Sequence, residues 1–151
     1  QRMSRWIGID HGTKRIGLAA GDTAGGIATP LDVIPAEPLD QAIRKILQRA
    51  EEYHATGIVV GWPLNMDDTE GPQGKLVREV AAKIESATGL DVRLWDERLS
   101  SFQADQALAG KLTRKKKKAR QDAVAAAAIL QDFLSCGGPE GAPKPNEIAP
   151  A

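Results

Sequence analysis

The sequence predicts an α/β fold in which a mixed five-stranded sheet is flanked by helices. Five short apolar segments are bounded by glycine, proline or charged residues, as buried strands are. The first three follow one another over short connections, which is typical of antiparallel strands, whereas the last two alternate with helical patterns, which is typical of parallel strands. At 151 residues the chain is long enough for one domain with a single core.

The order of the segments also predicts where each strand lies. The fourth segment is apolar throughout, as expected for a central strand that is covered on both faces. Because crossover connections are right-handed, the fourth and fifth strands should run parallel to the first, on its far side from the second and third. The expected strands are residues 6–10, 16–20, 27–34, 57–61 and 91–95.

Helices are expected between and after the later strands. Apolar residues spaced three and four apart predict helices over residues 39–50 and 72–88, and Gly89 is placed to end the second. Ser100 or Ser101 can cap a third helix, which stops at Gly110. The last helix is expected over residues 120–134, with an alanine-rich face that allows close packing on the sheet.

The chain after the last helix has a different composition. Residues 137–151 are rich in proline and glycine and have no periodic apolar face. We therefore expect a domain over residues 1–136 and a flexible tail over residues 137–151. The single cysteine, Cys136, cannot form an internal disulfide, which favours a reducing, cytoplasmic environment. No apolar run approaches the ~20 residues that span a bilayer, so we expect no membrane contact.

Charge is balanced overall but unevenly distributed. The chain has 20 Lys and Arg and 20 Asp and Glu, yet residues 111–120 (KLTRKKKKAR) hold seven cations and no acid. The rest of the chain then has 13 cations against 20 acids. We interpret residues 111–120 as a basic loop that offers a phosphate-binding surface, with a merely solvated loop as the alternative.

Asp10 ends the first expected strand, in the segment IGIDHGTKRIG. A buried carboxylate is costly unless it is paired or binds a cation. Lys14 and Arg15 can reach a polyanion, or they can form an ion pair with Asp10. Gly12 permits a tight turn or a close phosphate. His11 is a candidate for proton transfer, or a partly exposed neighbour without a role.

Further acids follow the fifth strand and enter the last helix. Asp96 and Glu97 come directly after the strand, although Asp96 could cap a helix and Glu97 could pair with Arg98 on the surface. Asp122 is expected in the first turn of the last helix, where the helix dipole alone favours an acid. If such acids meet Asp10 at one rim of the sheet, their repulsion demands cations. Oxygen ligands favour Mg²⁺ or Mn²⁺, and a pair of such ions can assist displacement at a phosphodiester.

Four segments, taken in order, resemble the motifs of a known family. They are IDHGTKRIGLA, IVVGWPLNMDDTEG, LWDERLSS and RQDAVAAAAIL. The chain resembles the YqgF family, also called RuvX, of ribonuclease H-like proteins related to the RuvC Holliday junction resolvase, over residues 6–134. The resemblance implies a ribonuclease H-like fold and a metal-dependent endonuclease. The resemblance also implies that this endonuclease acts on structured nucleic acid, in processing the precursor of small-subunit ribosomal RNA or in resolving Holliday junctions.

The resemblance also implies roles for individual residues. Asp10, Glu97 and Asp122 are the implied catalytic residues and ligands of Mg²⁺ or Mn²⁺. A homodimer is expected if branched DNA is the partner, because resolving a junction needs two active sites. The residues expected to bind nucleic acid are Lys14, Arg15, Arg98, Lys115, Lys116, Lys117 and Lys118.

The chain departs from the wider superfamily at the end of the fourth strand. Relatives such as RuvC carry an acid there, whereas this chain has Gly61-Trp62-Pro63-Leu64-Asn65. A fifth strand two positions from the first lies ~10 Å away, so Glu97 would have to reach back. Asp96, Asp67 or Asp68 are alternatives as ligands.

The missing acid motivates a second hypothesis, a nucleic-acid binding factor with weak or absent catalysis. Trp62 could stack on a base or belong to the core. Actin-like nucleotide phosphotransfer shares the D-x-G-T pattern, but such enzymes need two of these domains, and the chain has no P-loop motif.

Overall fold

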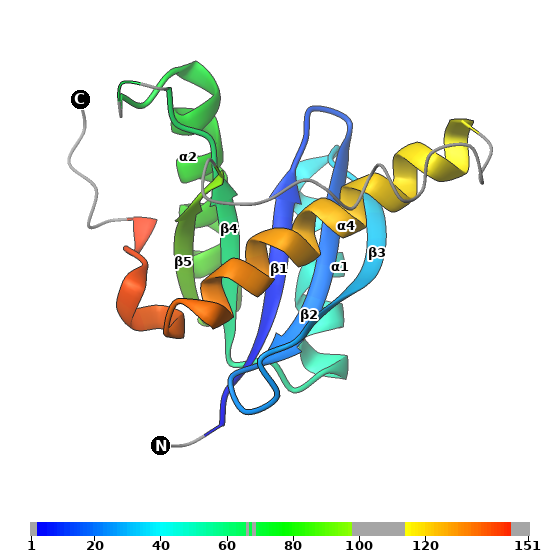
Figure 1. Cartoon of the computed structure of the whole chain (residues 1–151). Helices are drawn as coiled ribbons and strands as arrows, with labels where there is room; N and C mark the ends of the chain where they lie inside the picture. The colour runs from blue at the N-terminus through cyan, green and yellow to red at the C-terminus, as the bar shows by residue number, and fades with distance from the viewer. Residues whose placement is uncertain (1–2, 66, 68, 98–113, 146–151) are drawn as a thin grey trace.

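Five strands form one sheet in the order β3-β2-β1-β4-β5 (Figure 1). This computed structural model describes residues 3–65, 67, 69–97 and 114–145, and for residues 114–120 and 141 it describes the backbone alone. β1 pairs antiparallel with β2 and β2 with β3, whereas β4 is parallel to both β1 and β5. The predicted mixed sheet is confirmed. The strands are β1 (Arg5–His11), β2 (Arg15–Asp22), β3 (Ala28–Pro35), β4 (Gly57–Trp62) and β5 (Asp91–Asp96).

Helices cover both faces of the sheet. α1 (Leu39–Glu52) and α2 (Pro72–Thr88) lie on one face, and α4 (Arg114–Ser135) runs diagonally across the other (Figure 1). Gly89 has φ 70° and caps α2, as its position predicted. The helix expected between Ser100 or Ser101 and Gly110 falls outside the described residues. Among the helices that are described, none has the length and apolar character needed to cross a membrane.

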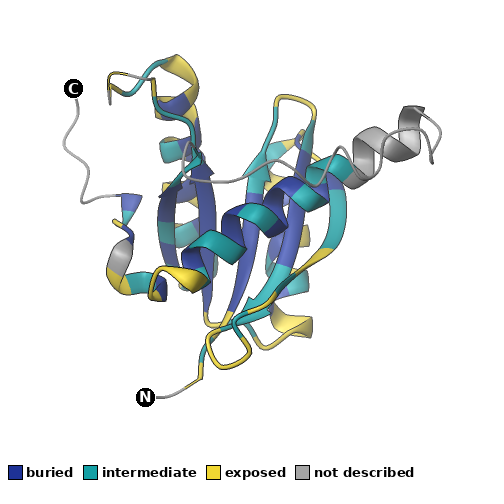
Figure 2. Cartoon of the chain, in the orientation of Figure 1, coloured by how far each residue is buried: buried dark blue, intermediate teal, exposed yellow. Residues whose placement is uncertain are grey.

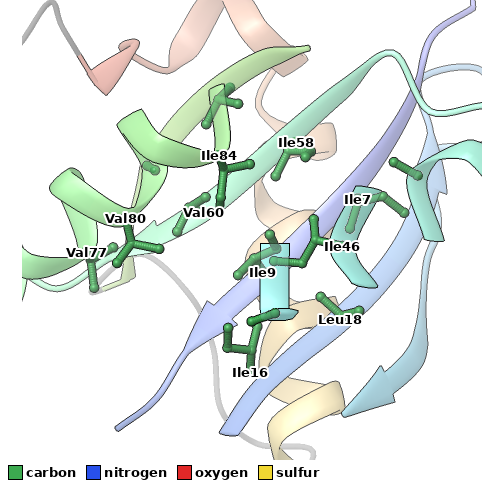
Figure 3. Close-up of a cluster of buried hydrophobic side chains, with 14 of the residues drawn as sticks. Ile7, Ile9, Ile16, Leu18, Ile46, Ile58, Val60, Val77, Val80 and Ile84 are labelled. Atoms are coloured by element: carbon green, nitrogen blue, oxygen red, sulfur yellow. The ribbon is translucent and has the colours of Figure 1, made fainter. Parts of the chain in front are cut away.

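The core has two layers because side chains alternate along each strand. Ile7 and Ile9 point toward α1 and α2, where they pack with side chains such as Ile46 and Ile84 (Figure 3). Trp6, on the alternate side of β1, belongs to the layer under α4. Figure 2 shows the central strands buried between these layers. Residues 6, 8 and 10 of β1 therefore lie on the face of the sheet that α4 covers. Asp10 is one of these residues.

The last helix begins earlier than its apolar pattern predicted. α4 starts at Arg114, so the backbone of Lys115 to Lys118 is helical and the expected basic loop is wrong there. Lysine, arginine and alanine are good helix formers, and no glycine or proline interrupts residues 111–135. The helix can therefore extend past the part that packs on the sheet. Asp122 lies eight residues after the first residue of α4, so the helix-dipole explanation for this acid does not apply.

The start of the expected tail is ordered against β5. A 3-10 helix, η2 (Gly138–Gly141), follows α4. Ala142, directly after η2, is buried in the core layer under α4. The Leu94 N–H donates to the Pro143 carbonyl at 2.8 Å. Arg93 donates from Nη1 to the carbonyls of Pro139 and Ala142. The prediction of a flexible tail is therefore wrong for residues 138–143, because Arg93 and Leu94 of β5 donate hydrogen bonds to carbonyl groups of this segment.

Candidate active site

Asp10 lies between two glycines in a row across the sheet. It pairs with Gly17 of β2, and the pairing of Ile9 with Val60 places it beside Gly61 of β4. Because side chains alternate, the carboxyl of Asp10 projects to the face covered by α4. The neighbouring strands therefore present no side chain next to it on that face.

Glu97 crosses the space that Gly61 leaves open. A Cβ atom built on Gly61 would lie 2.7 Å from Glu97 Oε1 and 2.9 Å from Glu97 Cγ. Glu97 follows β5, which is separated from β1 by β4, yet its carboxyl hydrogen-bonds that of Asp10. Glu97 thus reaches back across the fourth strand, as its predicted role requires.

The two carboxyl groups share a proton. Burial, the charge of Asp10, the hydrogen bond to Asp10 and the charge of Asp96 raise the pKa of Glu97 to about 8. Burial raises the pKa of Asp10, the hydrogen bond with Glu97 lowers it, and the charge of Asp122 raises it. Because the pKa of Glu97 is raised to about 8, its carboxyl holds a proton at neutral pH, so Glu97 is the donor and Asp10 the acceptor.

Asp122 approaches the same place from α4. A Cβ atom on Gly17 would overlap the main-chain carbonyl oxygen of Asp122, so this glycine lets α4 lie directly on β2. The Asp122 carboxylate accepts a hydrogen bond from Arg15 Nε at 2.5 Å. The sequence offered an ion pair of Asp10 with Lys14 or Arg15, whereas the described pair joins Arg15 to Asp122.

A cationic hollow adjoins the acids. It has a volume of about 270 Å³ and lies at the β1–β2 turn, where the Gly12 N–H donates to the Arg15 carbonyl at 2.8 Å. Lys14 is exposed beside it. A larger hollow of about 460 Å³ lies at the other end of β1, around Arg5 and Tyr53. We assign the candidate site to the smaller hollow because Asp122 lines it, whose charge acts on the carboxyl of Asp10. The residues that line it are Gly12, Thr13, Lys14, Arg15 and Asp122.

Some candidates are placed elsewhere. Asp67 accepts hydrogen bonds from the Thr69 N–H and hydroxyl within an exposed turn. Trp62 packs against the α1–α2 core layer and donates to Glu70 Oε2 at 3.0 Å, which favours its structural role. Arg98 and Asp68 lie outside the described residues, as do the side chains of Lys115 to Lys118.

His11 directly follows Asp10. Its Nδ1 atom is buried and, within the part of the chain that is described, has no hydrogen-bond partner. Burial lowers the pKa of His11, which favours the neutral imidazole.

Sequence reasoning missed the part played by the glycines. In the sequence, Gly61 marks only the place of a missing acid, and Gly17 has no feature that distinguishes it. A glycine inside an apolar strand often marks the close approach of another group, and the pattern Gly57-Ile58-Val59-Val60-Gly61 carried that signal.

The acids suit a divalent cation, although they are not arranged as a complete ligand set. In the described residues, no group of three or more acidic, histidine or cysteine side chains is placed to hold a metal ion. Asp10 and Glu97 are held together by a proton, and Asp122 is held by Arg15. Carboxylate oxygens are the ligands that Mg²⁺ and Mn²⁺ prefer, and a cation relieves the repulsion that raises the pKa values here. The donor set therefore fits such an ion.

The mixed sheet, with acids gathered where β1 ends, defines a ribonuclease H-like protein. RuvC of T. thermophilus, solved with a Holliday junction, matches 88% of this chain and 94% of its own with a TM-score of 0.55 at 13% identity. The Fowlpox virus resolvase, solved with junction DNA, matches 87% and 97% with a TM-score of 0.54 at 9% identity. These two likenesses show the fold.

The family follows from the sequence comparisons. The family model RuvX, described as Holliday junction resolvase, matches residues 4–136. A protein of Opitutus terrae named "Putative pre-16S rRNA nuclease" is 43% identical over 146 residues, 95% of this chain and 99% of its own. A protein of the same name from Geobacillus kaustophilus is 41% identical over 133 residues, 86% of this chain and 96% of its own. The chain belongs to the RuvX family, a family of nucleases.

Proposed function

We propose that this protein is a divalent-metal-dependent endonuclease that hydrolyses phosphodiester bonds in the precursor of small-subunit ribosomal RNA. The names of its relatives support this substrate, and the site supports the reaction class. The observation that carries the proposal is the pair of carboxyl groups of Asp10 and Glu97, which meet although β4 separates β1 from β5. A cation held by both carboxyl groups would relieve their mutual repulsion.

The acids are the proposed metal ligands. Asp10 and Glu97 would hold Mg²⁺ or Mn²⁺, with Asp122 as the third ligand. Held by these residues, the ion would supply a Lewis acid that polarises the phosphodiester. Glu97 must give up its proton to become a ligand. Arg15 neutralises Asp122 in the absence of the ion, so that the negative charge of Asp122 does not add to that of Asp10.

Cations around the acids would position the nucleic acid. Lys14 and Arg15 line the hollow next to Asp122, where a phosphate would lie close to the metal ligands. The basic run of α4 would bind the nucleic-acid backbone, since phosphate contacts supply a large share of the affinity for nucleic acid. The cytoplasmic location and the homodimer remain predictions. The remaining proposed contacts are Arg98, Lys115, Lys116, Lys117 and Lys118.

A cleavage assay tests the proposal. Purified protein is incubated with precursor ribosomal RNA and, separately, with four-way DNA junctions, each with Mg²⁺, Mn²⁺ or a chelator. We expect cleavage of the RNA only with a divalent ion, no cleavage by Asp10→Asn, and full cleavage by Asp40→Asn. Asp40 is a suitable control because it is an exposed acid of α1.

Other results of this assay have definite meanings. Cleavage of junctions alone would move the substrate to branched DNA. Salt-dependent binding without cleavage under any ion would favour the nucleic-acid binding factor. An Asp10→Asn variant with undiminished activity would refute the assignment of the site.

A further inference from the structure

We propose that Gly61 is a positioning residue for catalysis, which gives Glu97 its path across β4 to Asp10. The proposal rests on the proposed function, because it assigns a role to a further residue of the same site. Gly61 itself has no side chain with which to bind metal or substrate. Its contribution is the empty volume on the α4 side of the strand.

The contacts around Gly61 show which atoms occupy that volume. A Cβ atom there would lie 2.5 Å from Ile129 Cδ1, 2.7 Å from Glu97 Oε1 and 2.9 Å from Glu97 Cγ. All three distances are too short for a real contact, so alanine would force a displacement. The atoms that must move are the outer parts of two side chains, not backbone.

The backbone itself would accept alanine. Gly61 is not among the glycines with positive φ, which are Gly26, Gly89, Gly137 and Gly138. It also lies near the end of β4, where the regular pairing with β5 continues through Trp62. A Gly61→Ala variant should therefore fold with an unchanged sheet, while the side chains of Glu97 and Ile129 turn away from the new methyl group.

Gly57 provides a matched control. It lies on the same strand and, four residues earlier, on the same face as Gly61. A Cβ atom there would overlap the ring of Trp6, which is only 3% exposed. This ring is rigid and packed, so Gly57→Ala should lower stability more than Gly61→Ala does. Gly57 lies at the far end of β4 from the acids, so Gly57→Ala should leave the geometry of the acids intact.

The first experiment measures Mn²⁺ affinity by calorimetry together with kcat and KM. For Gly61→Ala we expect Mn²⁺ affinity and kcat to fall about 10- to 100-fold, as for other residues that orient metal ligands, with an unchanged KM for nucleic acid. For Gly57→Ala we expect a lower Tm with near-normal affinity and kcat. Wild-type affinity and kcat in Gly61→Ala, or equal losses in both variants, would overturn the proposal.

The second experiment is a double-mutant cycle with Glu97→Gln. If Gly61 acts only through Glu97, then Gly61→Ala adds no further loss once Glu97 has been replaced. Adding Gly57→Ala to Glu97→Gln should change Tm alone. Independent, additive losses from Gly61→Ala and Glu97→Gln would contradict the proposed path.

A crystal structure of metal-free Gly61→Ala separates this inference from the proposed function. If the wild-type protein cleaves no nucleic acid, the proposed function fails, whereas the placement of Glu97 can still be read directly. A Glu97 carboxyl turned away from Asp10 supports the positioning role. A Glu97 carboxyl that still meets Asp10 overturns it.

Discussion

Glu97 donates a hydrogen bond to Asp10 although β4 lies between β1, which carries Asp10, and β5, which Glu97 directly follows. The bond needs a proton, because two ionised carboxylates cannot bond to each other. The pair therefore carries less negative charge than its composition implies until the pH passes the pKa of Glu97, about 8. Both the stability of the fold and its affinity for a cation should therefore change with pH as Glu97 loses its proton.

The first prediction concerns stability. The pKa of Glu97 is raised from 4.5 to about 8 in the folded state, so its proton stabilises the fold fully below pH 4.5 and this stabilisation is lost as pH rises through 8. Because glutamine does not ionise, Glu97→Gln should remove this loss of stability at high pH. In a chelator, the Tm of this variant should exceed that of wild type increasingly from pH 5 to 8 and by a constant amount above that, at about 2–4 °C for each kcal/mol.

The control for this comparison is Glu51→Gln, an exposed glutamate of α1. Its Tm should follow that of wild type at every pH. A constant difference in Tm between wild type and Glu97→Gln across the range would show that Glu97 does not hold the proton.

The second prediction concerns the cation. Mn²⁺ must displace the proton from Glu97, so binding below pH 8 should release about one proton, and affinity should fall about tenfold for each pH unit below 8. Calorimetry in two buffers with different ionisation enthalpies counts the protons. Binding that releases none at pH 7 would exclude Glu97 as a ligand.

The third prediction concerns Arg15, which holds Asp122 in an ion pair at 2.5 Å. Arg15→Gln should free Asp122 and so tighten Mn²⁺ binding in the absence of nucleic acid, while the lost phosphate contact should raise KM. Arg49→Gln is the matched control, since Arg49 pairs with Asp32 at 2.6 Å and is exposed to a similar extent. Unchanged Mn²⁺ affinity in Arg15→Gln would count against Asp122 as a ligand.

The fourth prediction concerns the basic run of α4. Replacing Lys115 to Lys118 by glutamine should weaken nucleic-acid binding and reduce its salt slope by up to about 0.7–0.9 for each lysine that contacts phosphate. Replacing the exposed Lys45, Lys75 and Lys83 of α1 and α2, on the opposite face, should leave the slope unchanged. Equal effects from both sets would point to general charge instead of a defined surface.

The ends of α4 show why some boundaries could not be read from the sequence. The predicted start at Arg120 followed the apolar face, but helix propensity carries the backbone back to Arg114. At the other end, the composition of residues 137–151 predicted flexibility. Residues 138–143 are nevertheless held by β5, and no local pattern announces a partner that lies more than forty positions earlier in the chain.

Local sequence determined the elements and their order. Apolar runs, helical spacing and turn residues sufficed for the five strands, for α1 and α2, and for the parallel placement of β4 and β5, because these follow from short-range sterics and the handedness of crossovers. The motifs also selected Asp10, Glu97 and Asp122. Only the tertiary structure decided how acids so far apart in the chain meet. Their meeting depends on the space left by Gly17 and Gly61. The sequence shows that these positions lack a side chain, but only the structure shows that Asp122 and Glu97 occupy the space.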